Sequence, residues 1–571
     1  MISVASENPC GSRMSRPGRS GTGLRMKSRS IRSRGRMFGM TFHDRAIIVS
    51  MLLPIKFAPA AVLAASAFAA TPCAGLAKVS LPHVTITTAQ LVEAGEFKPP
   101  QGQPVRVRSA FCRVAGTIRP SAASDIALEV WMPARDWNGK FQGIGNGGYA
   151  GSVGYGQLAA AVSRGYAAAA TDTGHRAGGQ DARWALNQPE KIIDFGHRAI
   201  HETALAAKAL IREHYGDGPK RSYFNSCSNG GRQALMEAQR YPEDYDGIIA
   251  GAPANAWTLL LTYAAAGTHA LLSKPESYLP DRKLPTIQNA VRGSCDALDG
   301  VRDGTIEDPS RCRFDPAVLE CKGPESDSCL TQPQLQALRK LLGGLRTNKG
   351  KLLFPAISPG GEAEPGGWGP WITGPAPEKS SMFAFGTQFF KNMVYSDPDW
   401  DYRSFNVDRD YKAARRLAKH LDATSPDLSR FAARGGKLIL YHGWCDAAIP
   451  AQNTINYYNS VVKKMGAGRT QGFVRLFMAP GVQHCSGGSA PNVFGQAGPP
   501  SRDADHDIGA ALERWVEQGV APERIIATKY RGPNPSGEVE RTRPLCAYPA
   551  VARYKGSGDI NDAASFVCAK P

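Results

Sequence analysis

A serine in a sharp turn between a strand and a helix most constrains how this chain can fold. Residues 221–226 are typical of a short strand, and the residues after Ser228 favour a helix. Such a turn needs small neighbours, here Ser226, Gly230 and Gly231, so that the hydroxyl projects above a sheet with a helix N-terminus behind it. Ser226 stands where a glycine is usual. The pattern predicts a nucleophile elbow, with a plain turn as the alternative when it is taken alone.

Two further residues follow strand-like segments in the order that such an elbow requires. Asp446 lies on a loop after residues 436–441, and His484 lies on a loop after residues 473–478. The chain order serine, aspartate, histidine is that of α/β hydrolases. We therefore expect Ser228 to be the nucleophile, His484 the general base and acid, and Asp446 the group that fixes the histidine tautomer. This chemistry suits attack on an ester carbonyl.

A glycine-rich loop, residues 143–151, follows another predicted strand. Its glycines allow a backbone amide to approach a substrate oxygen closely. We expect the oxyanion of an acyl-transfer intermediate to be bound by the amide of Asn229 and by that of Gly148, with Gly147 as the alternative. Taken alone, the loop is also typical of a phosphate-binding turn or a tight turn.

Cysteines stand directly beside both the serine and the histidine. A disulfide between Cys227 and Cys485 would span 258 positions of the chain and keep the two loops together. In the chain-entropy account, closing such a loop stabilises the fold by roughly 5 kcal/mol, although measured gains are often smaller. The alternative is a pair of buried free thiols.

Together these residues resemble the tannase and feruloyl esterase family, which also contains the hydrolase of mono(2-hydroxyethyl) terephthalate. The likeness rests on the Cys-Ser, Asp and His-Cys arrangement, the Gly-Asn-Gly-Gly loop, and residues 170–175 and 446–450. It runs from about Cys73 to Cys568. It implies an α/β class, an α/β-hydrolase fold with a large inserted lid domain, and esterase activity.

The resemblance also implies a pairing for ten of the 12 cysteines. The pairs are Cys73 with Cys112, Cys227 with Cys485, Cys295 with Cys312, Cys321 with Cys329, and Cys546 with Cys568. Many disulfides are typical of an oxidising compartment. Cys10 precedes the region of likeness, so Cys445 remains as a single thiol, either a buried small residue or a reactive group near the site.

Residues 295–312 form an acidic, glycine-containing segment between two cysteines. Calcium prefers six to eight oxygen ligands, which acidic side chains and exposed carbonyls of a curled loop can supply. The segment looks like the calcium loop in the lid domain of the family, and its spacing is not that of an EF-hand. We expect a structural calcium ion and no organic cofactor, with a solvated acidic turn as the alternative. The expected ligands are the carboxylates of Asp296, Asp299 and Asp303 and the carbonyls of Val301 and Thr305.

The first 69 residues have the pattern of a basic leader and signal peptide. Residues 57–69 are apolar and end in a cleavage pattern near Ala69, which predicts a secreted or periplasmic protein. The stretch is too short for a stable membrane span, so we expect no stable membrane insertion after cleavage. Residues 1–36 are basic, and Met37, Met40 and Met51 are alternative starts.

The leader also explains half of the formal net charge. It contributes +9 of the +18, and the other +9 is spread over about five hundred residues without a nucleic-acid-binding motif. We therefore expect no nucleic-acid partner. The sequence does not indicate the oligomeric state.

Strand and helix patterns alternate on both sides of a Pro- and Gly-rich middle segment, which predicts four parts. These are the leader, 1–69; the first part of the hydrolase domain, 70–254; the lid domain, 255–434; and the second part of the hydrolase domain, 435–571. Strands are expected at 125–131, 141–144, 166–171, 221–226, 246–253, 436–441 and 473–478, and helices at 191–215 and 505–518.

The lid is expected to roof the site and shape the substrate pocket. Ile449, three residues after Asp446, is the expected pocket residue. An aromatic stretch of the lid is more typical of core than of pocket: Phe383, Phe385, Phe389, Phe390, Tyr395 and Trp400. In the terephthalate-ester hydrolase a lid arginine binds the substrate carboxylate, and no equivalent is evident here, although Lys391 lies in that region.

The resemblance implies an esterase for aromatic acyl esters, with feruloyl (hydroxycinnamoyl) esters of plant polysaccharide as the first expectation. Galloyl esters and mono(2-hydroxyethyl) terephthalate are the alternatives. The expected partner is thus a small aromatic ester or an ester-decorated polysaccharide. Two hypotheses from other classes are a non-catalytic protein that binds plant phenolics and an envelope-bound structural protein that keeps its leader.

Overall fold

A nine-stranded mixed sheet forms the centre of the protein, seen here in a computed structural model that describes residues 70–496, 503–532 and 537–570. Its strand order is β1-β4-β5-β7-β6-β8-β9-β12-β13, antiparallel from β1 to β7 and parallel from β7 to β13. The strands are β1 (Val84–Val92), β4 (Phe111–Ile118), β5 (Ile126–Pro133), β6 (Lys140–Gly143), β7 (Ala167–Thr171), β8 (Arg221–Cys227), β9 (Gly247–Gly251), β12 (Lys437–Gly443) and β13 (Val474–Ala479).

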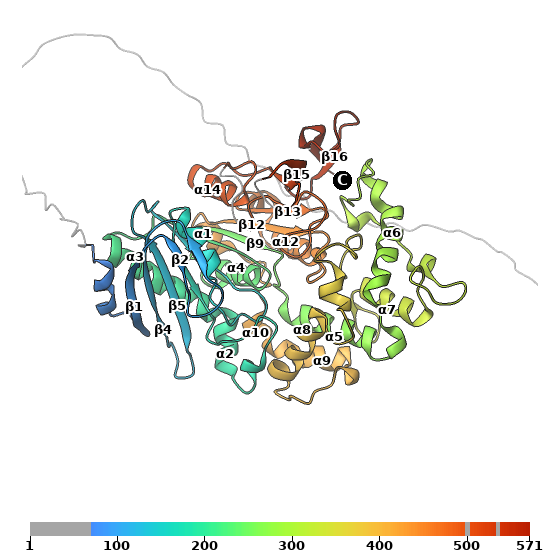
Figure 1. Cartoon of the computed structure of the whole chain (residues 1–571), viewed down its shortest axis with the longest axis horizontal. Coiled ribbons are helices and arrows are strands. Elements are labelled where there is room, and N and C mark those ends of the chain that lie inside the picture. The colour runs from blue at the N-terminus through green and yellow to red at the C-terminus, as the bar shows by residue number, and fades with distance from the viewer. Residues whose placement is uncertain (1–69, 497–502, 533–536, 571) are drawn as a thin grey trace, which may run out of the picture. The chain divides into compact units, whose positions relative to one another are not determined.

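Helices cover both faces of this sheet. Successive residues of a strand point to opposite faces, so buried strands are apolar almost throughout. In β12, Leu438 and Leu440 belong to one buried cluster with residues of helices α3 (Ala199–Tyr215), α4 (Asn229–Arg240) and α12 (Ala451–Met465). On the other face, Ile439 and Tyr441 belong to a second buried cluster with residues of α1 (Tyr155–Ser163) and α14 (Ile508–Gln518). Figure 1 shows these layers around β9, β12 and β13. The predicted α/β-hydrolase fold is confirmed.

All seven predicted strands are present within one or two residues of their predicted limits. The helix predicted at 191–215 is less regular, because α2 (Pro189–Ile193) passes through a wide turn at Asp194–Arg198 before α3 begins. The antiparallel strands β1 and β4 were not predicted. Small two-stranded sheets join β2 (Gly95–Phe97) to β3 (Val105–Val107), β10 (Leu345–Arg346) to β11 (Leu352–Phe354), β14 (Arg524–Tyr530) to β15 (Val539–Cys546), and β16 (Val551–Tyr554) to β17 (Phe566–Ala569).

The segment predicted as a lid, 255–434, is described in full and contributes no strand to the central sheet. It leaves the sheet after β9 and returns at β12. Its helices are α5 (Trp257–Leu272), α6 (Leu284–Cys295), α7 (Gln332–Leu342), α8 (Ser381–Gln388), α9 (Val407–Ala414), α10 (Ala418–Leu421) and α11 (Ser429–Ala433). All described residues belong to one compact unit, Ser66–Pro571, so this segment packs within that unit.

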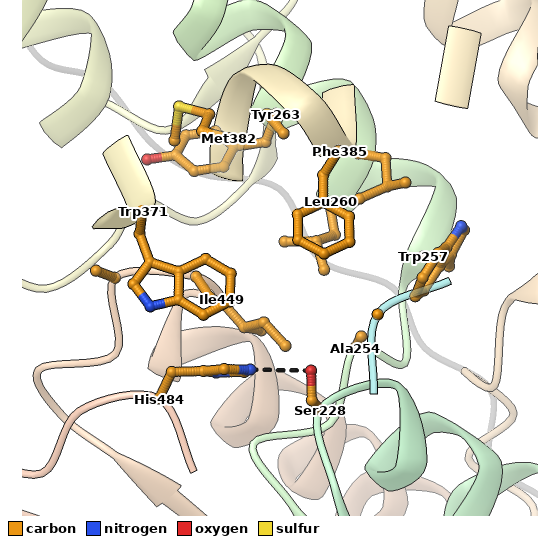
Figure 2. Close-up of a pocket in the computed structure, with 15 residues that line it drawn as sticks. Ser228, Ala254, Trp257, Leu260, Tyr263, Trp371, Met382, Phe385, Ile449 and His484 are labelled. Carbon is orange, nitrogen blue, oxygen red and sulfur yellow. Dashed lines mark hydrogen bonds between the residues drawn. The ribbon is translucent and has the colours of Figure 1, made fainter. Parts of the chain in front are cut away.

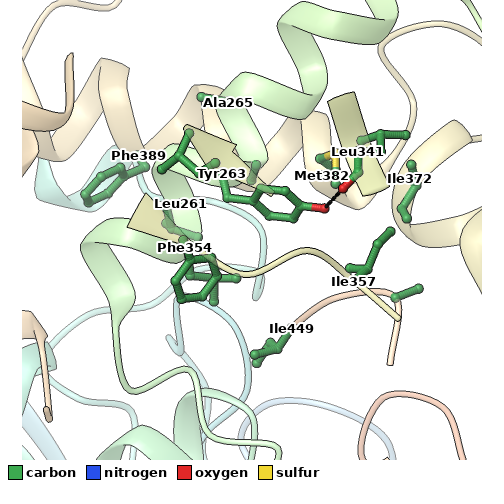
Figure 3. Packing of buried hydrophobic residues seen from close by; sticks show 14 of the residues in the cluster. Leu261, Tyr263, Ala265, Leu341, Phe354, Ile357, Ile372, Met382, Phe389 and Ile449 are labelled. Atoms are coloured by element: carbon green, nitrogen blue, oxygen red, sulfur yellow. Dashed lines mark hydrogen bonds between the residues drawn. The ribbon is translucent and has the colours of Figure 1, made fainter. Parts of the chain in front are cut away.

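Helix α5 is the apolar centre of the inserted segment. Twelve of its 16 residues are buried, and α7, α8 and α9 pack around it. Tyr263 of α5 donates a hydrogen bond of 3.0 Å to the Leu341 carbonyl, and Met382 and Ile372 lie beside this pair (Figure 3). Among the described residues, no helix is both long and apolar enough to span a membrane.

Candidate active site

Ser228 occupies a tight connection between β8 and α4. Its backbone is left-handed, with φ 66° and ψ −126°, which non-glycine residues adopt only when their surroundings enforce it. The Ser228 amide donates to the Gly251 carbonyl at 3.0 Å. A Cβ on Gly230 would overlap Ser226 Oγ, and one on Gly231 would overlap the Gly251 carbonyl, so both positions require glycine. The predicted elbow geometry is therefore present.

Three side chains from three separate loops form one hydrogen-bonded chain. His484 Nε2 lies 2.9 Å from Ser228 Oγ, and His484 Nδ1 lies 2.8 Å from Asp446 Oδ2 (Figure 2 shows the first contact). Ser228 follows β8, Asp446 follows β12 and His484 follows β13. In the parallel part of the sheet β12 and β13 are neighbours, and β9 lies between β8 and β12. The carboxyl ends of these strands bring together residues that are 256 positions apart in the chain.

Asp446 is fully buried, and its carboxylate accepts four hydrogen bonds. Oδ1 accepts from the amides of Ala448 and Ile449 at 2.8 and 2.9 Å. Oδ2 accepts from His484 and, at 3.1 Å, from His442 Nε2. Burial alone raises the pKa of Asp446, but the charge of His484 and the hydrogen bonds from both histidines outweigh burial and hold this pKa well below its ordinary value. The group is therefore an anion over the physiological range.

The predicted disulfide between Cys227 and Cys485 is present, with Cα atoms 5.9 Å apart. It joins the residue before the nucleophile to the residue after the histidine. The other four pairs implied by the family resemblance are also formed: Cys73–Cys112, Cys295–Cys312, Cys321–Cys329 and Cys546–Cys568. Cys445 is a buried free cysteine, and burial raises the pKa of its thiol to about 12. It is therefore present as a thiol rather than as a reactive thiolate.

Removing the Cys227–Cys485 bond is expected to lower both stability and activity. The double variant C227A/C485A opens a loop of 258 residues and should lose up to about 5 kcal/mol of unfolding free energy. As a control, C321A/C329A opens a loop of 8 residues, for which the same relation gives about 2.5 kcal/mol. Urea unfolding and kcat measure both. A kcat unchanged in both variants would contradict a role of the bond in aligning the site.

The two amides predicted for the oxyanion lie free at the site. Neither the Gly148 nor the Asn229 amide donates a hydrogen bond within the described residues. Gly148 lines the same cavity as Ser228, whereas the alternative, Gly147, does not. The Asn229 side chain accepts from the buried Arg232 at 2.8 Å, which fixes the first turn of α4. The Gly148 amide can therefore donate to an atom bound in the cavity, whereas Asn229, which does not line it, stays a prediction as the second donor.

An apolar cavity opens directly above Ser228 and His484 (Figure 2). In the described part of the chain it is lined by no Lys, Arg, Asp or Glu. The predicted Ile449 lines it, as does Phe385 of the aromatic stretch, while Phe389 and Phe390 belong to the core. Lys391 does not line it. Its other lining side chains include Trp257, Leu260, Leu261, Tyr263, Trp371 and Met382.

Sequence reasoning did not single out the two tryptophans of this cavity. Trp257 begins α5, and Trp371 lies in a wide turn at Gly369–Thr373. The Trp371 ring packs edge to face with the His484 ring, with centroids 4.9 Å apart. The sequence offers one signal for these two tryptophans. Both lie in the inserted segment, in stretches rich in small residues. A bulky aromatic in such a stretch has space to project from the backbone.

The acidic loop predicted to bind calcium offers oxygen donors. Asp299 Oδ1 and Asp303 Oδ1 accept from the amides of Val301 and Thr305, and Asp296 Oδ1 is buried without a hydrogen-bond partner among the described residues. Burial and, to a lesser degree, the Asp303 charge raise the pKa of Asp299, although the Val301 amide opposes this. An all-oxygen donor set with an unpartnered carboxylate oxygen suits a hard cation such as Ca²⁺.

Two observations show that the carboxylates of this loop are not already arranged around an ion. Asp303 Oδ2 is already paired with Arg543 and lies 3.3 Å from Arg541. Among the described residues, the three aspartates do not bring their carboxylates within 4.8 Å of one another. The residues therefore fit calcium in their chemistry, and the carboxylates would have to move closer together to hold an ion.

Comparison with known proteins gives consistent results over most of the chain. The family described as "Tannase and feruloyl esterase" matches residues 112–569. An uncharacterized esterase of Xanthomonas campestris pv. campestris is 43% identical over 532 residues, covering 89% of this chain and 92% of that protein. A probable feruloyl esterase B-2 of Aspergillus terreus is 32% identical over 535 residues, covering 91% and 99%. The crystal structure of feruloyl esterase B from Aspergillus oryzae superposes with a TM-score of 0.80 at 30% identity, covering 86% and 98%.

Proposed function

Because the chain belongs to the tannase and feruloyl esterase family, we propose that this carboxylic ester hydrolase cleaves esters of aromatic acids, foremost feruloyl (hydroxycinnamoyl) esters of plant polysaccharide. One observation carries the proposal. The hydrogen-bonded chain of Ser228, His484 and Asp446 opens onto a cavity lined by aromatic and aliphatic side chains. A planar aromatic acyl group has the shape and polarity that such a cavity binds.

In the proposed mechanism, His484 Nε2 takes the proton from Ser228 Oγ as this oxygen attacks the ester carbonyl. The tetrahedral oxyanion accepts hydrogen bonds from the amides of Gly148 and Asn229. Asp446 stabilises the imidazolium and keeps the Nδ1 proton in place. The carbon–oxygen bond to the alcohol then breaks, and the alcohol leaves with the proton from His484. A water molecule, deprotonated by His484, hydrolyses the acyl-enzyme and restores the Ser228 hydroxyl.

The polarity of the cavity distinguishes ferulate from the other two candidate acids. Gallate carries three hydroxyl groups, and each one left without a partner in an apolar pocket costs about 1–3 kcal/mol. Terephthalate carries a second carboxylate, and the cavity has no cationic side chain to pair with it. These costs favour a hydroxycinnamoyl group.

We also propose that the acidic loop binds a structural calcium ion through Asp296, Asp299, Asp303 and the carbonyls of Val301 and Thr305. A bound divalent ion would offset the charge of these carboxylates and draw them together in the loop that follows α6. None of these residues lines the cavity, so the proposal gives the ion no part in the reaction.

Export to an oxidising compartment is a further part of the proposal. It is supported by the five disulfides. The predicted signal peptide and its cleavage near Ala69 lie outside the described residues.

The test is hydrolysis of methyl ferulate, methyl gallate and mono(2-hydroxyethyl) terephthalate, compared by kcat/KM with S228A as the blank. We expect methyl ferulate to exceed the other two by about 10-fold or more, the equivalent of about one unpaired hydroxyl. A preference for methyl gallate would move the assignment to a tannase. No turnover of any of the three would contradict the proposed substrate class.

A further inference from the structure

A second histidine contacts the aspartate of the active site. His442 lies near the end of β12, four residues before Asp446, and it is fully buried. Its Nε2 lies 3.1 Å from Asp446 Oδ2 and 3.1 Å from the Ile449 carbonyl oxygen. Its Nδ1 lies 2.7 Å from Thr454 Oγ1 on α12. Both ring nitrogens thus have partners inside the protein.

These partners determine the tautomer of His442. A carboxylate oxygen and a carbonyl oxygen can only accept, so Nε2 must carry a proton and donate to both. A neutral ring then has an unprotonated Nδ1, which accepts from the Thr454 hydroxyl. Thr454 is itself fully buried. The ring is therefore locked with Nε2–H directed at the aspartate and at the loop that follows it.

The hydrogen bond from His442 restricts the rotation of the Asp446 carboxylate and affects its interaction with His484. Its Oδ1 is occupied by the amides of Ala448 and Ile449, and its Oδ2 is shared between His484 and His442. The carboxylate cannot rotate without breaking bonds on both sides. In addition, a donor on Oδ2 draws negative charge away from the bond to His484, so the basicity of His484 depends on His442.

We infer that His442 is a positioning residue that acts through Asp446, fixing the carboxylate and limiting the basicity of His484. The inference rests on the proposed ester hydrolysis. The titratable groups that face Asp446 are His484 and His442, and Tyr441, buried on the other face of β12, lies close enough to respond to the Asp446 charge. The Trp371 ring, which packs on His484, carries no charge.

Two substitutions with side chains of similar length test the hydrogen bond from His442 Nε2 to Asp446. H442Q places an amide nitrogen near the position of Nε2 and keeps a donor, whereas H442M fills similar space without one. In H442M we expect kcat for methyl ferulate to fall about 10-fold with KM within about twofold. The acid limb of the pH profile of kcat/KM should move up by about 0.5–1 unit, because Asp446 then holds the proton on His484 more strongly.

H442Q is expected to restore most of kcat and return the acid limb to within about 0.3 unit of wild type. Thermal unfolding of each variant checks that it is folded. If H442M does not fold, T454V provides the test, because it removes only the hydrogen bond to Nδ1 and should move kcat and the acid limb in the same direction by a smaller amount.

The outcomes separate this inference from the proposed function. An acid limb unchanged in folded H442M, or H442Q behaving as H442M does, would overturn the positioning role and leave the ester hydrolysis intact. Failure of the wild-type protein to hydrolyse any of the three test esters would instead reject the proposed function on which the inference depends.

Discussion

Replacing Ser228 by alanine is expected to lower kcat for methyl ferulate by about a millionfold. The reason is that the serine oxygen attacks the carbonyl and its hydroxyl donates to His484 Nε2, the atom that takes its proton. The fold should remain intact, since alanine removes one oxygen from a turn that the backbone of Gly251 and the glycines at 230 and 231 enforce. Substrate binding should also remain, because the cavity is otherwise unchanged.

A double variant provides the control for this loss. Residues that act as a unit are not additive, so S228A/H484A should be no slower than S228A by more than about threefold. Stopped assays over hours measure the residual rate, and isothermal titration with methyl ferulate measures binding. Retention of more than about 1% of kcat in S228A would show that another residue is the nucleophile.

Replacing Asp446 by asparagine is expected to lower kcat by about 10⁴-fold with a small effect on KM. The carboxylate accepts two hydrogen bonds on each oxygen. An amide has one oxygen, so its NH₂ group must face either the two histidines or the two loop amides. In the first orientation His484 loses its acceptor, and in the second the turn at Ala448 and Ile449 opens.

A buried aspartate elsewhere separates the chemical effect from the cost of a buried substitution. Asp507 is also fully buried and accepts from the amides of Gly509 and Ala510 at the start of α14. D507N should therefore lower the unfolding free energy and leave kcat within about twofold. If D446N and D507N had similar kcat values, the assignment of Asp446 to the reaction would be wrong.

Much of this site could be predicted because its parts are local. The elbow at Ser228 depends on glycines within three residues, and Asp446 and His484 each follow a strand that is apolar in sequence. The parallel sheet then brings these loops together at one edge. The pair Cys227–Cys485 was proposed from its position beside Ser228 and His484. The other four pairs came from the family resemblance rather than from spacing, since many pairings of twelve cysteines are formally possible.

The features of the fold and site that were not predicted depend on contacts between segments that are distant in the sequence. Trp257 and Trp371 reach the cavity only because the inserted segment folds over the sheet, and no local pattern specifies that geometry. The edge strand β1 alternates between partly buried and exposed residues, so its apolar pattern is weak. His442 lies four residues before Asp446 in the sequence, but its contacts with Asp446 and Thr454 depend on the turn after β12 and on the packing of α12.

The disulfide beside the nucleophile has a consequence for how the protein is made. Cys227 leaves the ribosome 258 residues before its partner, an interval of about 13–50 s at ordinary rates of synthesis. Six other disulfide cysteines emerge before Cys485: Cys73, Cys112, Cys295, Cys312, Cys321 and Cys329. A chain that entered an oxidising compartment during synthesis could pair Cys227 with any of these. The yield of active protein would then depend on a disulfide isomerase that corrects such pairs.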